Sequence, residues 1–256
     1  MNRSERVEVF QDTFKRTKAE SVAEVIKETD TLAETDACTN VEVVEGTSFG
    51  VAKKYADKKV CVLNFASATN AGGGVKRGSS AQEECLCRES SLYKSIMTDA
   101  LWGEYYAYHR EKHNNLYTNR LVFVPKVKVI KDANGKDIEP FFASVIGCAA
   151  PNLREKPSNA MNPCASAPVK ITDKDLLTLL TERYRRVIAL AEEKGVEVLV
   201  TGAIGCGAFK NKPEIVARAW KDALKKNGAK LEKVVFGVYC GGEDKTNYTV
   251  FKRVLG

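Results

Sequence analysis

The chain has 256 residues and a formal net charge of +7 at pH 7, with 44% hydrophobic and 29% charged residues. Such a composition is ordinary for a globular protein, and the length suits one large α/β domain or two small ones. The chain holds no apolar run of about 18 residues and no apolar signal core near its start, so we expect no spanning helix and a cytoplasmic location. The positive charge fits phosphate-bearing ligands, but charge alone favours a solvated lysine surface.

The eight cysteines are scattered along the chain, and no CxxC pair occurs. In a reducing compartment they are expected to be buried free thiols rather than disulfides. Cys85 and Cys87 are separated by a single residue, which does not suit the usual zinc knuckle. We therefore expect no metal and no cofactor.

Apolar periodicity and turn residues predict helices that alternate with strands. The predicted helices, in chain order, are 2–28, 48–57 with Ser48 as its cap, 83–97, 175–194 and 213–227. The predicted strands are 41–44, 59–65, 121–125, 141–148, 196–201 and 234–239. This alternation indicates an α/β fold with a mostly parallel or mixed sheet, covered on both faces.

Two loops rich in small residues follow predicted strands. The first holds Gly72, Gly73 and Gly74, and the second is the segment 202–211, GAIGCGAFKN. Ligands of such sheets bind at the carboxyl ends of the strands, where glycines let a ligand approach bare backbone. The second loop also leads into a helix N-terminus, whose N–H groups suit a diphosphate. Together the loops predict a nucleotide-like ligand.

Glu83 and Glu84 open the predicted helix that follows the glycines. Acidic residues are common in a first helical turn because they complement the helix dipole, so the pair alone is a weak signal. Its place directly after the glycine loop suggests chemistry instead. Glycoside cleavage needs a proton donor for the leaving oxygen and a base for water, and burial would have to raise the pKa of the acid.

Gly72-Gly73-Gly74, seven further residues and then Gln82-Glu83-Glu84 resemble the signature of the poly(ADP-ribose) glycohydrolases. The segments 62–74 (VLNFASATNAGGG), 144–153 (SVIGCAAPNL) and 202–211 resemble the compact bacterial members. The resemblance implies a macrodomain-like three-layer α/β/α fold over 1–256, with a mixed central sheet and a helical extension at 1–40 packed on it. Two departures are Ala71, where proline is frequent, and Lys210, where a glycine is common.

The resemblance also implies roles for individual residues. Glu84 would protonate the departing ribose oxygen and then activate water, while Glu83 would hold ribose hydroxyls, through an oxocarbenium-like transition state. The residues expected to bind substrate are Asn64, Asn70, Gly72, Gly73, Gly74, Gln82, Gly205, Cys206, Gly207, Ala208 and Phe209. Among them Phe209 would pack on the distal ribose. The family needs no metal.

The resemblance predicts a hydrolase, a glycosidase that releases ADP-ribose from poly(ADP-ribose) and so reverses ADP-ribosylation. Its partners would be the polymer, ADP-ribose and ADP-ribosylated proteins, with no membrane and no specific DNA binding; a monomer is the default. The alternatives are a hydrolase of mono-ADP-ribosylated protein, an ADP-ribose-binding macrodomain without activity, and a nucleotide-binding interaction protein. Three segments are left open: a hairpin at 128–140, which either flanks the pocket or lies apart from it, a long loop at 154–170 that could act as a lid, and 239–248, which either lines an adenine site or only packs.

Overall fold

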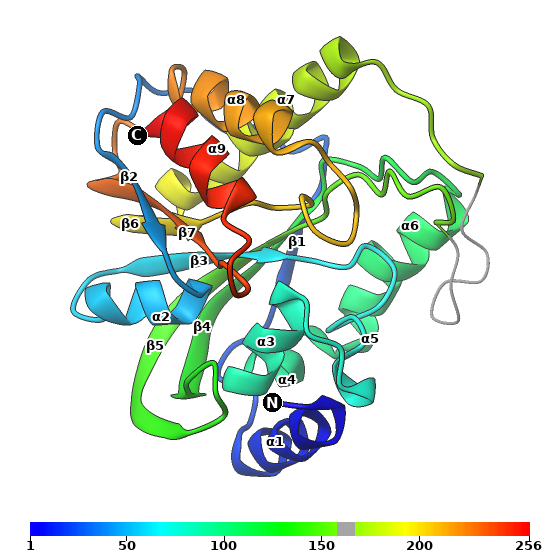
Figure 1. Ribbon diagram of the computed structural model, residues 1–256, viewed down its shortest axis with the longest axis vertical. Helices are drawn as coiled ribbons and strands as arrows, with labels where there is room; N and C mark the ends of the chain where they lie inside the picture. The colour runs from blue at the N-terminus through cyan, green and yellow to red at the C-terminus, as the bar shows by residue number, and fades with distance from the viewer. Residues whose placement is uncertain (158–166) are drawn as a thin grey trace.

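A mixed seven-stranded sheet with the order β1-β4-β5-β3-β6-β7-β2 runs through the computed structural model, which describes residues 1–157 and 167–256 (Figure 1). The strands are β1 (Glu24–Ile26), β2 (Val41–Glu45), β3 (Val60–Phe65), β4 (Leu121–Lys131), β5 (Asp137–Cys148), β6 (Val198–Thr201) and β7 (Lys233–Val238). Strands β5, β3, β6, β7 and β2 are parallel neighbours, whereas β4 pairs antiparallel with β1 and β5. The expected mixed sheet is confirmed.

Helices cover both faces of this sheet, with α7, α8 and α9 on one side and α1 to α4 on the other (Figure 1). The helices are α1 (Arg3–Arg16), α2 (Ser48–Ala52), α3 (Gln82–Glu89), α4 (Leu92–Ile96), α5 (Asp99–Leu101), α6 (Tyr108–Glu111), α7 (Asp173–Glu193), α8 (Pro213–Leu224) and α9 (Thr246–Leu255). A π-helical segment, Trp102–Ala107, joins α5 to α6. None of the helices in the described residues has the length and apolar character needed to cross a membrane.

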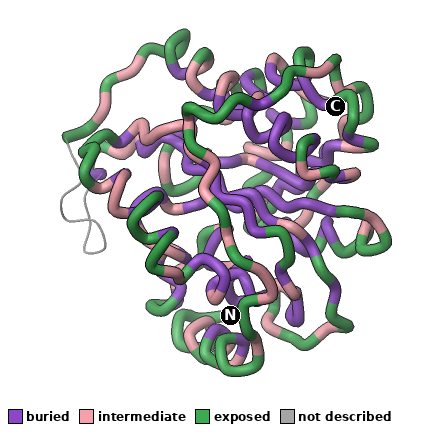
Figure 2. Tube along the Cα trace, turned by 180° about the vertical axis from the view of Figure 1, so that it is seen from behind, coloured by how far each residue is buried: buried purple, intermediate pink, exposed green. Residues whose placement is uncertain are grey.

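The central strand β3 shows why three layers form. All residues from Val60 to Asn64 are buried, and successive side chains of a strand point to opposite faces. Cys61 and Leu63 accordingly join the core under α7 and α8, while Val60 and Val62 join the core under α2 and α3. Figure 2 shows the buried residues concentrated in these inner strands.

The N-terminal prediction is wrong beyond residue 16. The helix expected over 2–28 ends at Arg16, and Thr17 has extended backbone. Strand β1 follows and pairs with the stretch Leu121–Phe123 of β4. The segment 1–40 is therefore not a helical extension as a whole, because part of it completes the edge of the sheet.

The helix expected over 83–97 is interrupted. Ser90 has extended backbone, and its hydroxyl donates to the Leu86 carbonyl at 2.7 Å. Ser90 forms a β-bridge with Val129 and Ser91 exchanges hydrogen bonds with Lys128, so both serines pair with β4 instead of continuing the helix. At the start of α2, Thr47 rather than Ser48 occupies the cap position, and the α-helix ends at Ala52 instead of Asp57.

Strands β4 and β5 extend beyond their predicted bounds and form the expected hairpin. Its turn holds Asn134 and Gly135, and Gly135 has a φ of 78°, which glycine adopts without strain. The long loop expected over 154–170 lies partly in the described part of the chain. Residues 158–166, and with them most of the suggested lid, lie outside the described residues.

Candidate active site

A cavity of about 760 Å³ opens at the carboxyl ends of the parallel strands. Its walls include residues within two positions of the ends of β3, β6 and β7: Ala66, Ala203 and Tyr239. This is the edge of the sheet at which α/β proteins bind their ligands. The predicted site residues that line it are Asn70, Gly73, Gln82, Glu83, Glu84, Gly205, Gly207, Ala208 and Phe209.

Glu83 is a buried carboxyl held from two sides. Only 3% of the residue is exposed, and its carboxylate accepts hydrogen bonds from the Ser67 backbone N–H at 2.8 Å and the Asn64 amide at 3.2 Å. Burial, assisted by the negative charge of Glu84, raises the pKa of Glu83 to about 8. Glu83 is thus largely protonated at neutral pH, so the raised pKa expected of a catalytic acid is found on this glutamate.

Glu84 is held by the glycine loop. Its Oε1 accepts the Gly74 backbone N–H at 2.8 Å. Gly73 has a φ of 56°, and a Cβ added there would lie 2.5 Å from the same Oε1. A side chain at Gly73 would therefore displace the carboxylate, so this glycine makes room for Glu84 itself.

Gly72 and Gly74 do not line the cavity. Direct contact with a diphosphate and ribose, the role expected of them, would require them to line it. A Cβ at Gly72, where φ is 68°, would meet the Tyr93 ring at 2.6 Å, and one at Gly74 would meet the Ser79 hydroxyl at 2.3 Å. These two glycines let the loop fold back on α3 and α4. Their visible role is to shape the loop that carries Gly73.

The Gln82 and Asn64 side chains form hydrogen bonds with other parts of the protein. The Gln82 amide accepts from the Phe65 N–H at 2.9 Å and donates to the Leu63 carbonyl at 2.8 Å and the Ser48 hydroxyl at 2.9 Å. It ties the start of α3 to the end of β3. Asn64 does not line the main cavity, and its amide instead supports Glu83.

The second glycine loop forms the opposite wall. Gly207 and Ala208 are exposed, and Phe209 is half-buried with its ring centroid 6.3 Å from that of Tyr117. Cys206 does not line the cavity; its thiol packs against the hydrophobic core, where burial raises its pKa to about 12. Lys210 has a φ of 61°, a left-handed conformation that favours glycine.

The family model "Microbial-type PARG, catalytic domain" matches residues 2–132, just over half of the chain. The chain belongs to this family. PARG is poly(ADP-ribose) glycohydrolase, a glycosidase, and the matched segment includes the glycines, Gln82 and both glutamates. No curated protein matches the chain.

Solved structures of bacterial PARGs have the same fold. PARG of Thermomonospora curvata bound to the inhibitor ADP-HPD is 27% identical, with a TM-score of 0.82 over 98% of this chain and 99% of that one. PARG of Deinococcus radiodurans in complex with ADP-ribose is 31% identical, with a TM-score of 0.73 over 97% and 90% of the two chains. The macrodomain-like fold class is confirmed.

Two residues that line the cavity are not among those predicted from the sequence. Tyr117 lines it with a φ of 56°, a strained value for an aromatic residue, and such strain is concentrated at functional sites. Arg154 also lines it, and its guanidinium lies 5.8 Å from the Phe209 ring centroid. Arg154 comes directly after the segment 144–153, and its position after a strand end could have indicated a binding residue. No sequence pattern indicates Tyr117.

Two arginines form hydrogen bonds that hold segments of the cavity wall in place. Arg183 of α7 is buried and donates to the Ala149 carbonyl at 2.8 Å and the Leu116 carbonyl at 3.1 Å, beside wall residues of two segments. Arg110 donates to the Thr69 carbonyl at 2.9 Å and to the Asn70 side-chain oxygen at 2.6 Å. Asn70 is therefore oriented by Arg110 at the cavity edge.

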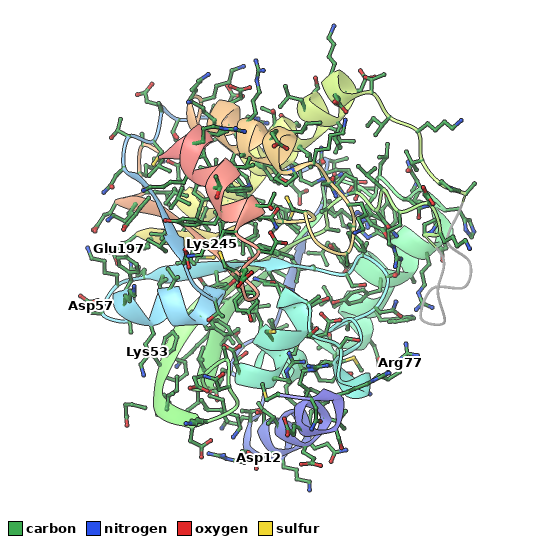
Figure 3. The ribbon with its side chains drawn as sticks, in the orientation of Figure 1. Asp12, Lys53, Asp57, Arg77, Glu197 and Lys245 are labelled. Carbon is green, nitrogen blue, oxygen red and sulfur yellow. The ribbon has the colours of Figure 1, made fainter. Side chains whose placement is uncertain are left out.

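The segments left open by the sequence reach the same cavity. Ala133 and Asn134 of the hairpin turn line it, so the hairpin flanks the site. Tyr239 and Asn247 also line it. Lys245, which lies between them in the sequence and is labelled in Figure 3, pairs with Glu45 at 2.6 Å. Within 1–157 and 167–256, no group of three or more His, Cys, Asp or Glu side chains is arranged to hold a metal ion.

Proposed function

We infer that this protein is a poly(ADP-ribose) glycohydrolase that hydrolyses ribose–ribose O-glycosidic bonds and releases ADP-ribose. The observation that carries the inference is the buried Glu83–Glu84 pair, set in the cavity of a chain that belongs to the microbial PARG family. Glycoside cleavage needs a positioned carboxyl group as acid and base, and this pair places two carboxyl groups side by side in the cavity. A protein that only binds ADP-ribose has no need of this pair.

We assign the acid–base role to Glu84 and the ribose hydroxyls to Glu83. The Gly74 N–H orients the Glu84 carboxylate, which supports its action on the leaving oxygen and then on water. The protonated Glu83 carboxyl has both a donor and an acceptor for sugar hydroxyls. The exposed Gly207 and Ala208 suit a diphosphate, and the Arg154 guanidinium beside Phe209 adds a positive charge there.

The test is an assay of the wild type and of Glu84→Gln on purified poly(ADP-ribose) and on a mono-ADP-ribosylated protein, with and without a chelator. The wild type should release ADP-ribose from the polymer in both conditions. Glu84→Gln should lose at least about 100-fold in kcat and keep its affinity for ADP-ribose. Glu193→Gln, at the exposed end of α7, is the matched control and should keep full activity.

Three results would contradict this assignment. Binding of ADP-ribose without any release by the wild type would make the protein a reader. Release only from the modified protein would make it a mono-ADP-ribosyl hydrolase. Loss of ADP-ribose affinity in Glu84→Gln, with its fold intact, would move the acid–base role elsewhere.

The same proposal includes a single domain that works as a monomer in the cytoplasm. The pairing of β1 with β4 supports one domain, because it draws the N-terminal segment into the common sheet. The seven cysteines of the described residues are free thiols, which suits a reducing compartment. Light scattering should give the mass of one 28.2 kDa chain, and a dimer mass would contradict the monomer.

A further inference from the structure

A second, internal cavity lies beside Asn64 at the end of β3. Its walls come from β3, α4, β4, β5 and the π-helical segment Trp102–Ala107, and the residues that line it are all buried. Isolated π-helical turns are rare and are frequently found at functional sites. Among the lining residues within 1–157 and 167–256, Asn64 and Tyr106 alone have polar side chains. This polar pair in an apolar cavity indicates a site for a small polar molecule.

One end of the Asn64 amide has no partner. Asn64 is only 3% exposed, and its Nδ2 donates to the Glu83 carboxylate at 3.2 Å. Its Oδ1 is buried and accepts no hydrogen bond from the described residues. A buried side-chain oxygen normally has a donor, which is either a protein group or an ordered water. Because Asn64 lines the internal cavity, a donor bound there would complete its hydrogen bonding.

Gly147 leaves space for such a donor. It lies directly opposite Asn64 in the parallel pair of β3 and β5. A Cβ at Gly147 would lie 3.3 Å from the Cβ of Val122 and 3.6 Å from that of Ala66, and both residues belong to the cavity wall. The cavity has a volume of about 10 Å³, and a single water molecule needs about 10–15 Å³. The size of the cavity therefore suits one water.

Tyr106 offers a second polar group to a molecule in this cavity. Burial and, next, the negative charge of Glu83 raise the pKa of Tyr106 well above its ordinary value. The hydroxyl therefore lies close enough to Glu83 to sense its charge, and it stays protonated. A phenol hydroxyl can both donate and accept a hydrogen bond, and a buried water needs about two to four polar partners. Asn64 Oδ1 and the Tyr106 hydroxyl together meet this need.

We propose that the internal cavity binds one water molecule, which donates a hydrogen bond to Asn64 Oδ1 and forms another with the Tyr106 hydroxyl. The water determines which end of the Asn64 amide faces Glu83, because an amide turned by 180° would present its oxygen there. Tyr106 is thus a positioning residue that acts on Glu83 through the water and Asn64. The proposal rests on the glycohydrolase function inferred above and on the role of Glu83 in holding ribose hydroxyls.

A high-resolution crystal structure of the wild type tests the water directly. One water should lie within hydrogen-bond distance of both Asn64 Oδ1 and the Tyr106 hydroxyl. The absence of electron density at this position would overturn the proposal, whether or not the protein is active.

Tyr106→Phe tests the positioning role. The variant removes one hydroxyl and keeps the ring, so kcat on poly(ADP-ribose) should fall about fivefold, the effect of losing one hydrogen bond. KM should stay near the wild-type value, because the second glycine loop and Phe209 are untouched. Tyr105→Phe is the matched control: the Tyr105 hydroxyl is buried without a hydrogen-bond partner in the described residues, and Tyr105 does not line the internal cavity. This control should keep the wild-type kcat.

Gly147→Ala tests the same site by filling it. The added methyl group takes the space of the water, so kcat should fall as it does in Tyr106→Phe. In a cavity that holds no water, the methyl group would instead fill a void, raise the thermal midpoint and leave kcat unchanged. That result would overturn the water site.

The outcomes separate this proposal from the function itself. No release of ADP-ribose by the wild type would overturn both the function and the role of Tyr106 in it. Release by the wild type, with equal kcat in Tyr106→Phe and Tyr105→Phe, would overturn the positioning role alone.

Discussion

The two walls of the cavity are built in opposite ways. On the α3 wall Glu83 and Glu84 are 3% and 7% exposed, and backbone N–H groups hold both carboxylates. On the facing wall Gly207 and Ala208 are exposed loop residues. Groups that act in a transition state must be oriented before the substrate arrives, whereas a phosphate-binding loop must leave its backbone open to the ligand.

Each wall has a residue with left-handed backbone conformation, and the two residues differ in the space around them. Gly73 at φ 56° stands against the Glu84 carboxylate, and Lys210 at φ 61° stands at the exposed end of the second loop. At the first position a Cβ would displace the Glu84 carboxylate. The second tolerates a lysine because only the backbone conformation is strained.

The largest effect is expected from Gly73→Ala. The new Cβ displaces the Glu84 carboxylate, so kcat on poly(ADP-ribose) should fall by about 100-fold or more. The matched variant is Gly207→Ala, where a Cβ meets nothing within 4 Å; its thermal midpoint should equal that of the wild type. Equal kcat in Gly73→Ala and the wild type would remove the contrast between the walls.

The second effect is a pH dependence of the free energy of unfolding that arises from Glu83 on the α3 wall. The folded protein raises the pKa of Glu83 from 4.5 to about 8, so it binds a proton that the unfolded chain has released in this range. The free energy of unfolding should therefore fall as pH rises from about 5 through 8, by a few kcal/mol at most. Glu83→Gln should flatten this fall in urea titrations at each pH, and an unchanged slope would contradict the buried, protonated state.

Phe209→Ala tests the binding wall. Loss of the half-buried ring should weaken ADP-ribose binding about tenfold, which is about 1.4 kcal/mol, in a calorimetric titration. Phe142→Ala, a 43% exposed ring of β5, is the control and should leave the dissociation constant unchanged. An unaltered constant for Phe209→Ala would take this ring out of the site.

The smallest effect is expected from Lys210→Gly. Glycine adopts the left-handed conformation without strain, so the free energy of unfolding should rise by up to about 1 kcal/mol. Thermal unfolding at fixed pH measures it. The opposite sign would show that the lysine side chain stabilises the loop more than its backbone strains it.

Apolar periodicity predicts much of the fold. The wrong predictions have physical causes. The predicted central strands occur near their expected bounds because their apolar runs need cover on both faces. The apolar spacing of residues 17–28 predicts a helix, but Glu24–Ile26 gains backbone partners on the free edge of β4. The helix over 83–97 breaks because Ser90 and Ser91 pair with β4, a contact that local spacing does not encode.

The sequence by itself determined the family and the chemical groups, because a triple glycine followed by Gln82, Glu83 and Glu84 is a local pattern. Tertiary structure decided what each residue touches. Gly73 lies against Glu84, and Gln82 ties α3 to β3. Cys206 packs against the core, and Tyr117 and Arg154 lie beside Phe209. These relations depend on packing between segments far apart in the chain, where space and hydrogen-bond partners are set by the whole sheet rather than by neighbouring residues.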